Sequence, residues 1–212
     1  MSEAKSNLYG VPQGSILGPI LFNIFINDIS KINSLPEITT SSTIYADDVQ
    51  LLFSDSPNNL EQLKIYAETS LNTMKEFYSE NGLKMNSNKT QCILLNSQSS
   101  QCKRTETFQI RIDDTLRHME DKVKNLGVIF DSRLSLEHHI KSLCSRLNGT
   151  LSYLNMVKNT LDQKSTILLI NAIKLSHPNY CSSIRGKCSE KLQYEVQNVS
   201  TLLQKLQAMG NI

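Results

Sequence analysis

Several common features are absent or sparse in this chain of 212 residues, and each absence narrows its class. There is no Trp, and 8 Gly and 5 Pro are too few for a collagen-like or Pro-rich architecture. The 5 Cys are odd in number and show no Cys-x-x-Cys spacing, so a disulfide framework is not expected. Neither sign of charge dominates, since 22 Lys and Arg face 20 Asp and Glu, and the net charge of +2 does not single out a nucleic-acid binder. Because 39% of the residues are apolar, the chain can still bury a core, which excludes a wholly disordered protein.

Long hydrophobic runs are also missing. The most apolar stretch, Ile16 to Ile29, is shorter than the roughly 20 residues of a membrane span. The polar N-terminus has no apolar signal-peptide core. We therefore expect no membrane segment and a reducing intracellular compartment, either nucleus or cytoplasm. A zinc site at His177, Cys181 and Cys188 is disfavoured, because a fourth ligand is missing and the spacing is irregular.

The first half of the chain alternates between helix and strand patterns. A helix buried on several faces is expected at Ser15–Ile32, with Ser15 as its N-cap. Thr43–Phe53 alternates with period two and predicts a β-hairpin with Asp47-Asp48 at its bend. An amphipathic helix is expected to follow Ser56-Pro57 and to end at Asn81-Gly82.

The second half changes from strands to helices. Four short strands are expected, at Leu83–Asn86, Gln91–Asn96, Phe108–Ile112 and Asn125–Phe130, the third ending in a solvated turn at Asp113-Asp114. Helical spacing of apolar residues then predicts three helices, at Leu136–Leu154, Ile167–Leu175 and Leu192–Leu206. The fold class is therefore α+β, with a boundary near residue 133 between a mixed unit and an all-helical one.

Two adjacent carboxylates, Asp47 and Asp48, lie inside an otherwise apolar hairpin. Removing them from water is costly unless something compensates their charge. Mg²⁺ is a natural partner, since it is commonly held by one or two carboxylates together with substrate phosphates. The alternative is an ordinary solvated Asp-Asp turn, and the dipeptide alone favours that alternative.

A Gly/Pro-rich loop, Gly10–Ser15, precedes the first expected helix. Its glycines and Pro12 allow another molecule to approach the backbone closely, and Gln13 can hydrogen-bond a base edge or a sugar. The alternative is a plain loop followed by a helix cap, and the segment alone favours that alternative.

In combination, the two motifs resemble those of the reverse transcriptase family, and most closely its non-LTR, LINE-like branch. Tyr45-Ala46-Asp47-Asp48 follows Pro12-Gln13-Gly14-Ser15 by some thirty residues, as in that family. Further segments resemble later parts of the family in order. These segments are Asn81–Asn86 with Lys89-Thr90 (a palm motif), Lys124–Val128 (the primer-grip hairpin), and Leu134–Leu154 with Leu175–Cys181 (the thumb region).

The resemblance implies a polymerase fold. Residues 1–132 would form a partial palm, made of a helix and a small antiparallel sheet, and residues 133–212 an all-helical, thumb-like region. The implied partners are an RNA template, a DNA primer and deoxynucleotide triphosphates; the oligomeric state stays open.

The resemblance also implies roles for single residues. Asp47 would bind two catalytic Mg²⁺ ions, with Mn²⁺ as a substitute, and Asp48 would be a weaker ligand or support it. Pro12, Gln13, Gly14 and Ser15 would contact primer, template or incoming nucleotide, and Tyr45 would pack near the primer end. Lys89 would neutralise or protonate the departing pyrophosphate, unless it is an ordinary surface lysine.

One element of the family pattern has no counterpart. The first metal-binding Asp of the family precedes the Pro-Gln-Gly segment, whereas only nine residues precede Gly10 here and Glu3 is their sole acidic residue. The basic fingers region is also missing. We therefore expect an N-terminally truncated and inactive fragment of an RNA-directed DNA polymerase. The alternative is a non-catalytic, nucleic-acid-binding retrotransposon remnant, or a translated fragment without function; a palm-type nucleotidyl cyclase is disfavoured by the Pro-Gln-Gly-Ser loop.

The charge is unevenly distributed along the chain. Residues 1–60 carry two Lys and six acidic residues, for a net charge of −4, and residues 133–212 carry ten Lys or Arg and four acidic residues, for +6. Lys141, Arg146, Lys158 and Lys164 could follow a phosphate backbone, or could simply be the solvated faces of amphipathic helices.

Overall fold

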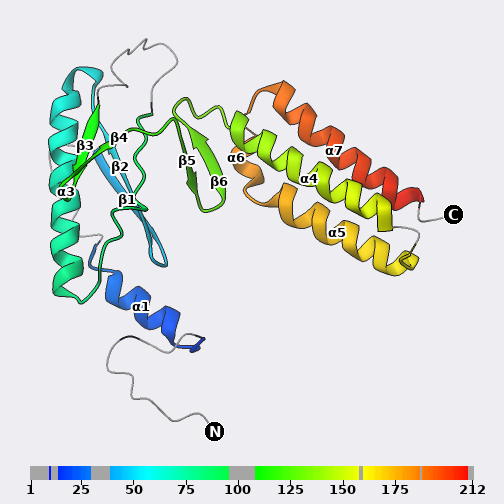
Figure 1. The fold of residues 1–212 in the computed structure, drawn as a ribbon, viewed down its shortest axis with the longest axis horizontal. Coiled ribbons are helices and arrows are strands. Elements are labelled where there is room, and N and C mark those ends of the chain that lie inside the picture. The colour runs from blue at the N-terminus through cyan, green and yellow to red at the C-terminus, as the bar shows by residue number, and fades with distance from the viewer. Residues whose placement is uncertain are drawn as a thin grey trace, which may run out of the picture. The chain divides into compact units, whose positions relative to one another are not determined.

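The computed structural model describes Gly10 and residues 14–29, 39–95, 108–157, 160–186 and 188–209. Helices combine with three separate two-stranded antiparallel sheets, so the expected α+β class is confirmed (Figure 1). The chain divides into two compact units. The first draws on Met1–Thr90 and Phe108–His118, and the second on Gln91–Thr107 and Met119–Ile212.

Helix α1 of the first unit spans Gly18–Ile26, with a proline in its first turn. It is shorter than the predicted helix at Ser15–Ile32. Ser15 is not its N-cap; that position belongs to Leu17, which offers no capping side chain, and Ser15 contributes its backbone carbonyl to Gly18 at 3.3 Å. The helix ends at Ile26, and the N–H of the following Asn27 donates to the carbonyl of Ile24 at 3.4 Å.

The predicted burial of this helix on several faces is wrong. Only Gly18 and Ile26 are buried within it, together with the following Ile29. The described part of the first unit offers no element that covers the other faces. Six large apolar side chains are consequently exposed: Ile16, Leu17, Ile20, Leu21, Ile24 and Phe25.

The predicted hairpin is confirmed, and it is longer than expected. Strand β1 (Thr39–Tyr45) pairs with β2 (Asp48–Ser54), and the register places Ile44 opposite Val49 and Tyr45 opposite Asp48. Because side chains alternate between the two faces of a strand, the face that carries Ile44 and Val49 packs on the core and the face that carries Tyr45 and Asp48 is exposed.

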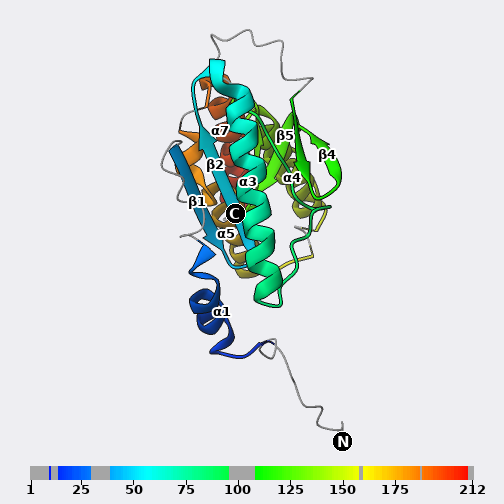
Figure 2. The same cartoon turned by 90° about the vertical axis from the view of Figure 1, so that its left-hand side faces the viewer.

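Helix α3 (Leu60–Glu80) follows a short 3-10 turn, η1 (Pro57–Asn59), and confirms the predicted amphipathic helix. It runs along the β1–β2 hairpin (Figure 2). Its buried residues are Ala67, Ser70, Met74 and Tyr78. Met74 and Tyr78 join Ile26 and Ile29 in the core of this unit. The helix ends at Asn81, and Gly82 takes a φ of +69°, a left-handed conformation that glycine adopts without steric cost.

Strand β3 (Gln109–Ile112) confirms the third predicted strand, and the turn at Asp113-Asp114 leads into its partner β4 (Thr115–His118), which the sequence pattern did not predict. The predicted strands at Leu83–Asn86 and Gln91–Asn96 are wrong where the structure describes them, since residues 83–86 and 91–95 contain no strand; Asn96 lies outside the described residues. Their apolar residues lack a ladder partner, because β3 and β4 pair with each other.

In the second unit, β5 (Lys122–Asn125) and β6 (Val128–Asp131) form another hairpin. The continuous strand predicted at Asn125–Phe130 is therefore wrong. Leu126 and Gly127 make a two-residue turn with φ values of +44° and +84°, which reverses the chain inside the predicted strand. The resemblance of Lys124–Val128 to a short hairpin is consistent with this geometry.

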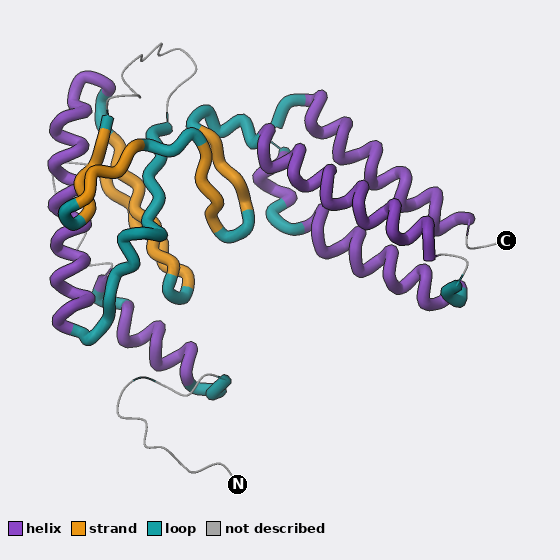
Figure 3. The backbone as a smooth tube through the Cα atoms, viewed as in Figure 1, coloured by secondary structure: helices purple, strands orange, loops and turns teal. Residues whose placement is uncertain are grey.

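The helices of the second unit are α4 (Glu137–Val157), α5 (Gln163–Asn179), the short α6 (Ser182–Arg185) and α7 (Glu190–Met209). The three long ones lie side by side (Figure 3). They confirm the predicted helical region, and the apolar stripe of α4 is buried as expected. Helix α5 begins earlier than predicted, because the carboxylate of Asp162 accepts the backbone N–H of Ser165 at 3.2 Å. Among the described residues, no helix is long and apolar enough to cross a membrane.

The β5–β6 hairpin packs against the helices of the second unit. Val128 is buried in the same core as Leu136, Leu147 and Ile170. The hairpin, which precedes residue 133, therefore belongs to the same compact unit as the helices. The division into a palm at residues 1–132 and a thumb-like region at residues 133–212 stays a prediction.

Candidate active site

The Tyr45–Asp48 segment forms the tight end of the β1–β2 hairpin. Tyr45 and Asp48 are paired across the strands, so Ala46 and Asp47 alone make the turn. Ala46 has a φ of +51°, as the first residue of such a two-residue turn requires. The turn thus presents two consecutive carboxylates at one end of the hairpin.

All three polar side chains at this end are open to solvent. Asp47 and Asp48 are both exposed, and Tyr45 is 64% exposed. Tyr45 shares its hairpin face with Asp48, while Ile44 and Val49 hold the opposite face against the core formed with α3. The apolar neighbours therefore anchor the turn, and the polar residues are free to meet another molecule.

The donor set at the turn suits a hard divalent cation that is shared with a phosphate-bearing partner. Two exposed carboxylates match the one or two that Mg²⁺ commonly takes from a protein beside substrate phosphates. Within the described residues, no group of three or more His, Cys, Asp or Glu side chains is placed to hold a metal ion. The two exposed carboxylates alone suit a cation site shared with another molecule.

The predicted nucleic-acid loop is only partly described. Pro12 and Gln13 lie outside the described residues. Gly14 is exposed with a φ of +87°, and Ser15 is half-buried.

Lys89 is exposed in a turn between α3 and β3, where its backbone N–H donates to the carbonyl of Asn86 at 3.0 Å. The structure brings Tyr45, Asp47 and Asp48 together at one turn. In the part of the chain that it describes, no hydrogen bond or ion pair joins Lys89 to them.

The sequence pattern did not predict the side-chain contacts around the turn that carries Lys89. We call this set of contacts the brace. The carboxylate of Asp113 forms an ion pair with Lys75 of α3 and accepts a hydrogen bond from the hydroxyl of Ser87. The guanidinium of Arg117 donates to the carbonyl of Ser87 at 3.2 Å and to Oδ1 of Asn88 at 3.0 Å. Asp113 is therefore not the merely solvated turn residue that was expected, and the β3–β4 hairpin holds the segment that carries Lys89.

The charges of this brace reinforce each other. The hydrogen bonds from Lys75 and Ser87 lower the pKa of Asp113, and Asp113 in turn raises the pKa of Lys75. Lys75 comes from α3, so an Asp-Asp pair in the sequence offers no signal for this partner. Only the approach of β3 to α3 reveals it.

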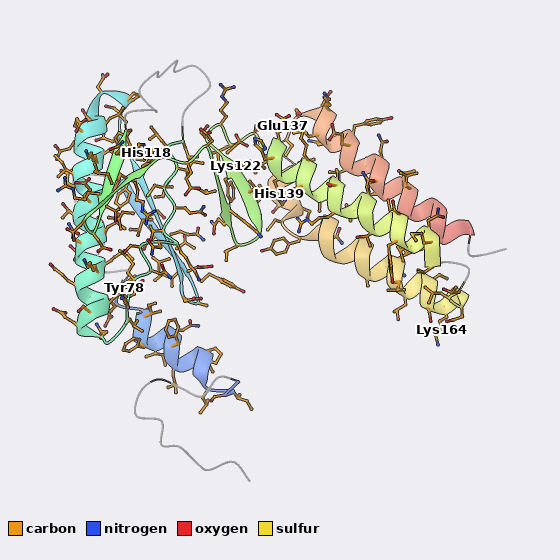
Figure 4. All side chains as sticks on the ribbon, in the orientation of Figure 1. Tyr78, His118, Lys122, Glu137, His139 and Lys164 are labelled. Atoms are coloured by element: carbon orange, nitrogen blue, oxygen red, sulfur yellow. The ribbon has the colours of Figure 1, made fainter. Side chains whose placement is uncertain are left out.

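The candidate phosphate-contacting residues of the helical region differ in their surroundings. Lys141 is ion-paired with Glu137 one turn earlier on α4, which partly neutralises it. Arg146 and Lys164 are exposed, and Lys158 lies outside the described residues. Figure 4 places Glu137 at the start of α4 and Lys164 near the start of α5.

Comparison with known proteins identifies the group to which these features belong. The model of the family described as "Reverse transcriptase (RNA-dependent DNA polymerase)" matches residues 3–130, which include both motifs and the β3–β4 hairpin. No solved structure matches the chain.

Curated relatives agree with this family. The chain is 30% identical over 166 residues to the "Probable RNA-directed DNA polymerase from transposon BS" of Drosophila melanogaster, over 76% of this chain and 17% of the relative. It is 27% identical over 177 residues to the "RNA-directed DNA polymerase from mobile element jockey" of Drosophila funebris, over 82% of this chain and 18% of the relative.

A third relative is the "Retrovirus-related Pol polyprotein from type-1 retrotransposable element R1" of Nasonia vitripennis. It is 25% identical over 150 residues, which make up 70% of this chain and 43% of the relative. The chain thus spans less than half the length of these three relatives. It belongs to the reverse transcriptase family, and its relatives are RNA-directed DNA polymerases of non-LTR retrotransposons.

Proposed function

We propose that this chain is the part of a non-LTR RNA-directed DNA polymerase that carries the Tyr-Ala-Asp-Asp turn of the catalytic palm. One observation carries the proposal: Tyr45–Asp48 close a core-anchored hairpin whose two carboxylates are exposed side by side. In this proposal residues 1–132 belong to the palm and residues 133–212 to a thumb-like helical region. The reaction takes place on an RNA template and a DNA primer, in the nucleus or the cytoplasm.

Asp47 and Asp48 are the proposed metal-binding residues. Mg²⁺ ions bound by these carboxylates, or Mn²⁺ in their place, would activate the primer 3′-hydroxyl and stabilise charge on the transferring phosphate. Tyr45, on the same hairpin face as Asp48, packs against the primer end. Ile44 and Val49 anchor the hairpin on the core of the first unit, which supports a fixed position for both carboxylates.

The remaining candidate residues act on the nucleic acid and the nucleotide. Pro12, Gln13, Gly14 and Ser15 line the template and the incoming-nucleotide pocket. Gly14 supports this role because it is exposed, has no side chain and adopts a left-handed backbone that other residues rarely take. Lys89 neutralises or protonates the departing pyrophosphate. The brace, in which Asp113 and Arg117 each hydrogen-bond Ser87, limits the movement of the turn that carries Lys89.

Metal binding at the turn can be tested with Mn²⁺ alone. Added Mn²⁺ is expected to broaden the amide NMR signals of residues 45–49 first, and Asp47→Asn is expected to abolish this selective broadening. Asp114→Asn is the matched control, because Asp114 is also an exposed turn carboxylate with a neighbouring Asp. Equal broadening in wild type and Asp47→Asn would contradict the metal-binding role.

We propose that these 212 residues alone do not extend a primer. Two carboxylates supply fewer oxygen ligands than a two-metal centre needs, and no described group of three ligands adds to them. Primer extension on an RNA template with Mg²⁺ or Mn²⁺ is expected to give no product. Extension that disappears in Asp47→Asn would overturn this expected inactivity while supporting the role of Asp47.

The second candidate function is nucleic-acid binding without catalysis, as in a retrotransposon remnant. The net charge of +6 over residues 133–212 favours it. Binding to an RNA–DNA duplex is expected to be weak and to fall steeply as salt is raised. If no binding is detected at low salt, both the thumb-like role and this second function are excluded.

A further inference from the structure

The turn of the β5–β6 hairpin has an unfavourable residue for its backbone. Leu126 and Gly127 both take positive φ values, +44° and +84°. Two-residue turns of this kind favour Asn-Gly or Asp-Gly, because Asn and Asp tolerate the left-handed conformation that a Leu side chain resists. Some other contact is needed to hold Leu126 in this conformation.

Tyr180 supplies that contact from a distant part of the chain. Its hydroxyl donates a hydrogen bond to the backbone carbonyl of Leu126. Its ring also packs over Gly127, since a Cβ atom added there would lie 3.4 Å from Cε1 of the tyrosine. A single side chain therefore contacts both residues of the turn.

Tyr180 is itself held at a helix junction. It directly follows α5, and Cys181 after it takes a left-handed φ of +51°. The carbonyl of Cys181 accepts the N–H of Ile184 at 3.1 Å, and both of these residues pack against the core of the helical bundle. Tyr180 is 51% exposed, but its neighbours along the chain are anchored on the bundle core.

The other end of the hairpin is anchored independently. Asp131, at the open end of β6, accepts backbone N–H groups from Ser135 and Leu136 just before α4, whereas Val128, which is buried in the bundle core, directly follows the turn. With Tyr180 at the tip, the hairpin is fixed at both ends. Its exposed side chains include Lys122 and Lys124 of β5, and Figure 4 marks Lys122 on this hairpin.

We infer that Tyr180 is a positioning residue that locks the Leu126-Gly127 turn, so that the hairpin presents Lys122 and Lys124 to the phosphates of the primer strand. The phosphate-contacting role rests on the proposed function, because it takes the hairpin as the primer grip. The lock itself rests only on the contacts of Tyr180 within the second unit.

Hydrogen exchange in the 212-residue chain tests the lock. Tyr180→Phe removes the hydroxyl and keeps the ring, so the amides of residues 125–128 are expected to exchange roughly 2- to 10-fold faster, which corresponds to the loss of one hydrogen bond. Tyr194→Phe is the matched control, because Tyr194 is 67% exposed on α7. Unchanged exchange in Tyr180→Phe, with the same thermal midpoint as wild type, would overturn the proposal.

A second substitution tests whether strain at Leu126 is what Tyr180 opposes. Leu126→Asn places a residue that readily adopts a left-handed backbone at the strained position. Added to Tyr180→Phe, it is expected to return the exchange of residues 125–128 to near the wild-type rate. Exchange that stays fast in the double variant would overturn this account of the lock.

Binding to an RNA–DNA primer–template duplex at low salt tests the positioning role. Both Lys124→Gln and Tyr180→Phe are expected to weaken binding several-fold, whereas Tyr194→Phe has no effect. If Lys124→Gln weakens binding and Tyr180→Phe does not, the positioning role is wrong. If the wild-type chain does not bind the duplex at all, the proposed function fails, and the lock is decided by the exchange experiments.

Discussion

At the scale of single residues, a buried carboxylate need not mark a catalytic site. Asp131 is 8% exposed, and its carboxylate accepts backbone N–H groups from Arg133, Ser135 and Leu136 at 3.1, 3.0 and 2.9 Å. The hydroxyl of Ser135 donates to it at 2.9 Å. These donors all lie in the short segment that leads into α4 at Glu137, so Asp131 stabilises the entry to that helix.

Removing this cap is expected to destabilise the second unit. Asp131→Ala leaves the N–H groups of Arg133, Ser135 and the buried Leu136 without this acceptor and should lower the free energy of unfolding by about 2 kcal/mol. Asp162→Ala, at the exposed cap of α5, should have a smaller effect. Urea unfolding followed by circular dichroism measures both; an equal loss for the two variants would contradict the special role of Asp131.

Stability should also fall in acid because of the same residue. Burial raises the pKa of Asp131, but the hydrogen bonds from Ser135, Arg133 and Leu136 outweigh it and hold the pKa below its usual value. The carboxylate therefore contributes stability above about pH 4, the pKa of an unfolded Asp. This contribution is lost as the pH falls through the lower, folded pKa. Asp131→Ala should flatten that part of the curve of unfolding free energy against pH.

Asp113 is expected to control the turn that carries Lys89. Asp113→Asn removes the ion pair with Lys75 and weakens the bond from Ser87, so the amide of Lys89 should exchange faster. The pKa of Asp113 is lowered, so the turn in the wild type should stay held at the usual pKa of Asp and loosen only as the pH falls through the lower, folded pKa. Asp114→Asn is the control, and equal exchange at Lys89 in both variants would show that the brace does not hold this turn.

At the scale of elements, helix α1 shows how weakly a helix can be tied to a core. Ile26 is 3% exposed and packs with Met74 and Tyr78, whereas Ile24, only two residues earlier, is 70% exposed. The two positions differ in direction around the helix, since two residues correspond to about 200° of rotation. Only one side of α1 therefore contributes to the core.

Matched substitutions on α1 should separate its two sides. Ile26→Ala should lower the unfolding free energy by about 3 kcal/mol, because it leaves a cavity in the core. Ile24→Ala should change it by no more than about 0.5 kcal/mol. Thermal or urea unfolding compares the pair, and similar losses would mean that the exposed side of α1 is packed in solution.

Elements that depend on local patterning were well predicted from the sequence. The stripe of α3 and the stripe of α4 both appear in their predicted positions, since helical periodicity is a local property. The strands predicted at Leu83–Asn86 and Gln91–Asn96 are absent from residues 83–86 and 91–95, which the structure describes, because a strand exists only with a partner and tertiary packing selects the partners. The turn at Leu126-Gly127 was missed by periodicity because Leu is a poor signal for a left-handed turn residue.

At the scale of the whole molecule, the two compact units have separate cores. One contains Ile29, Met74 and Tyr78, and the other contains Val128, Leu147 and Ile170. The low net charge of +2 averages an acidic first section and a basic helical end. Stability is therefore better described for each compact unit, and net charge for each section of the chain, than for the chain as a whole.

Core substitutions should therefore act on the unit that contains them. Leu147→Ala should destabilise the second unit by about 3 kcal/mol, and Met74→Ala the first by a similar amount. Hydrogen exchange of α4 and α3 amides reports on each unit separately. A single substitution that accelerates exchange equally in both helices would show that the two cores unfold as one.

The sequence by itself determined the family, the Tyr-Ala-Asp-Asp hairpin and the main helices, because motif spacing and periodicity are encoded along the chain. Only the tertiary structure decided which polar residues hold these elements. Lys75 forms an ion pair with Asp113, which is 38 positions away in the sequence. Tyr180 donates a hydrogen bond to Leu126, which is 54 positions away. No local pattern marks such pairs, since each depends on where packing brings two distant backbone segments together.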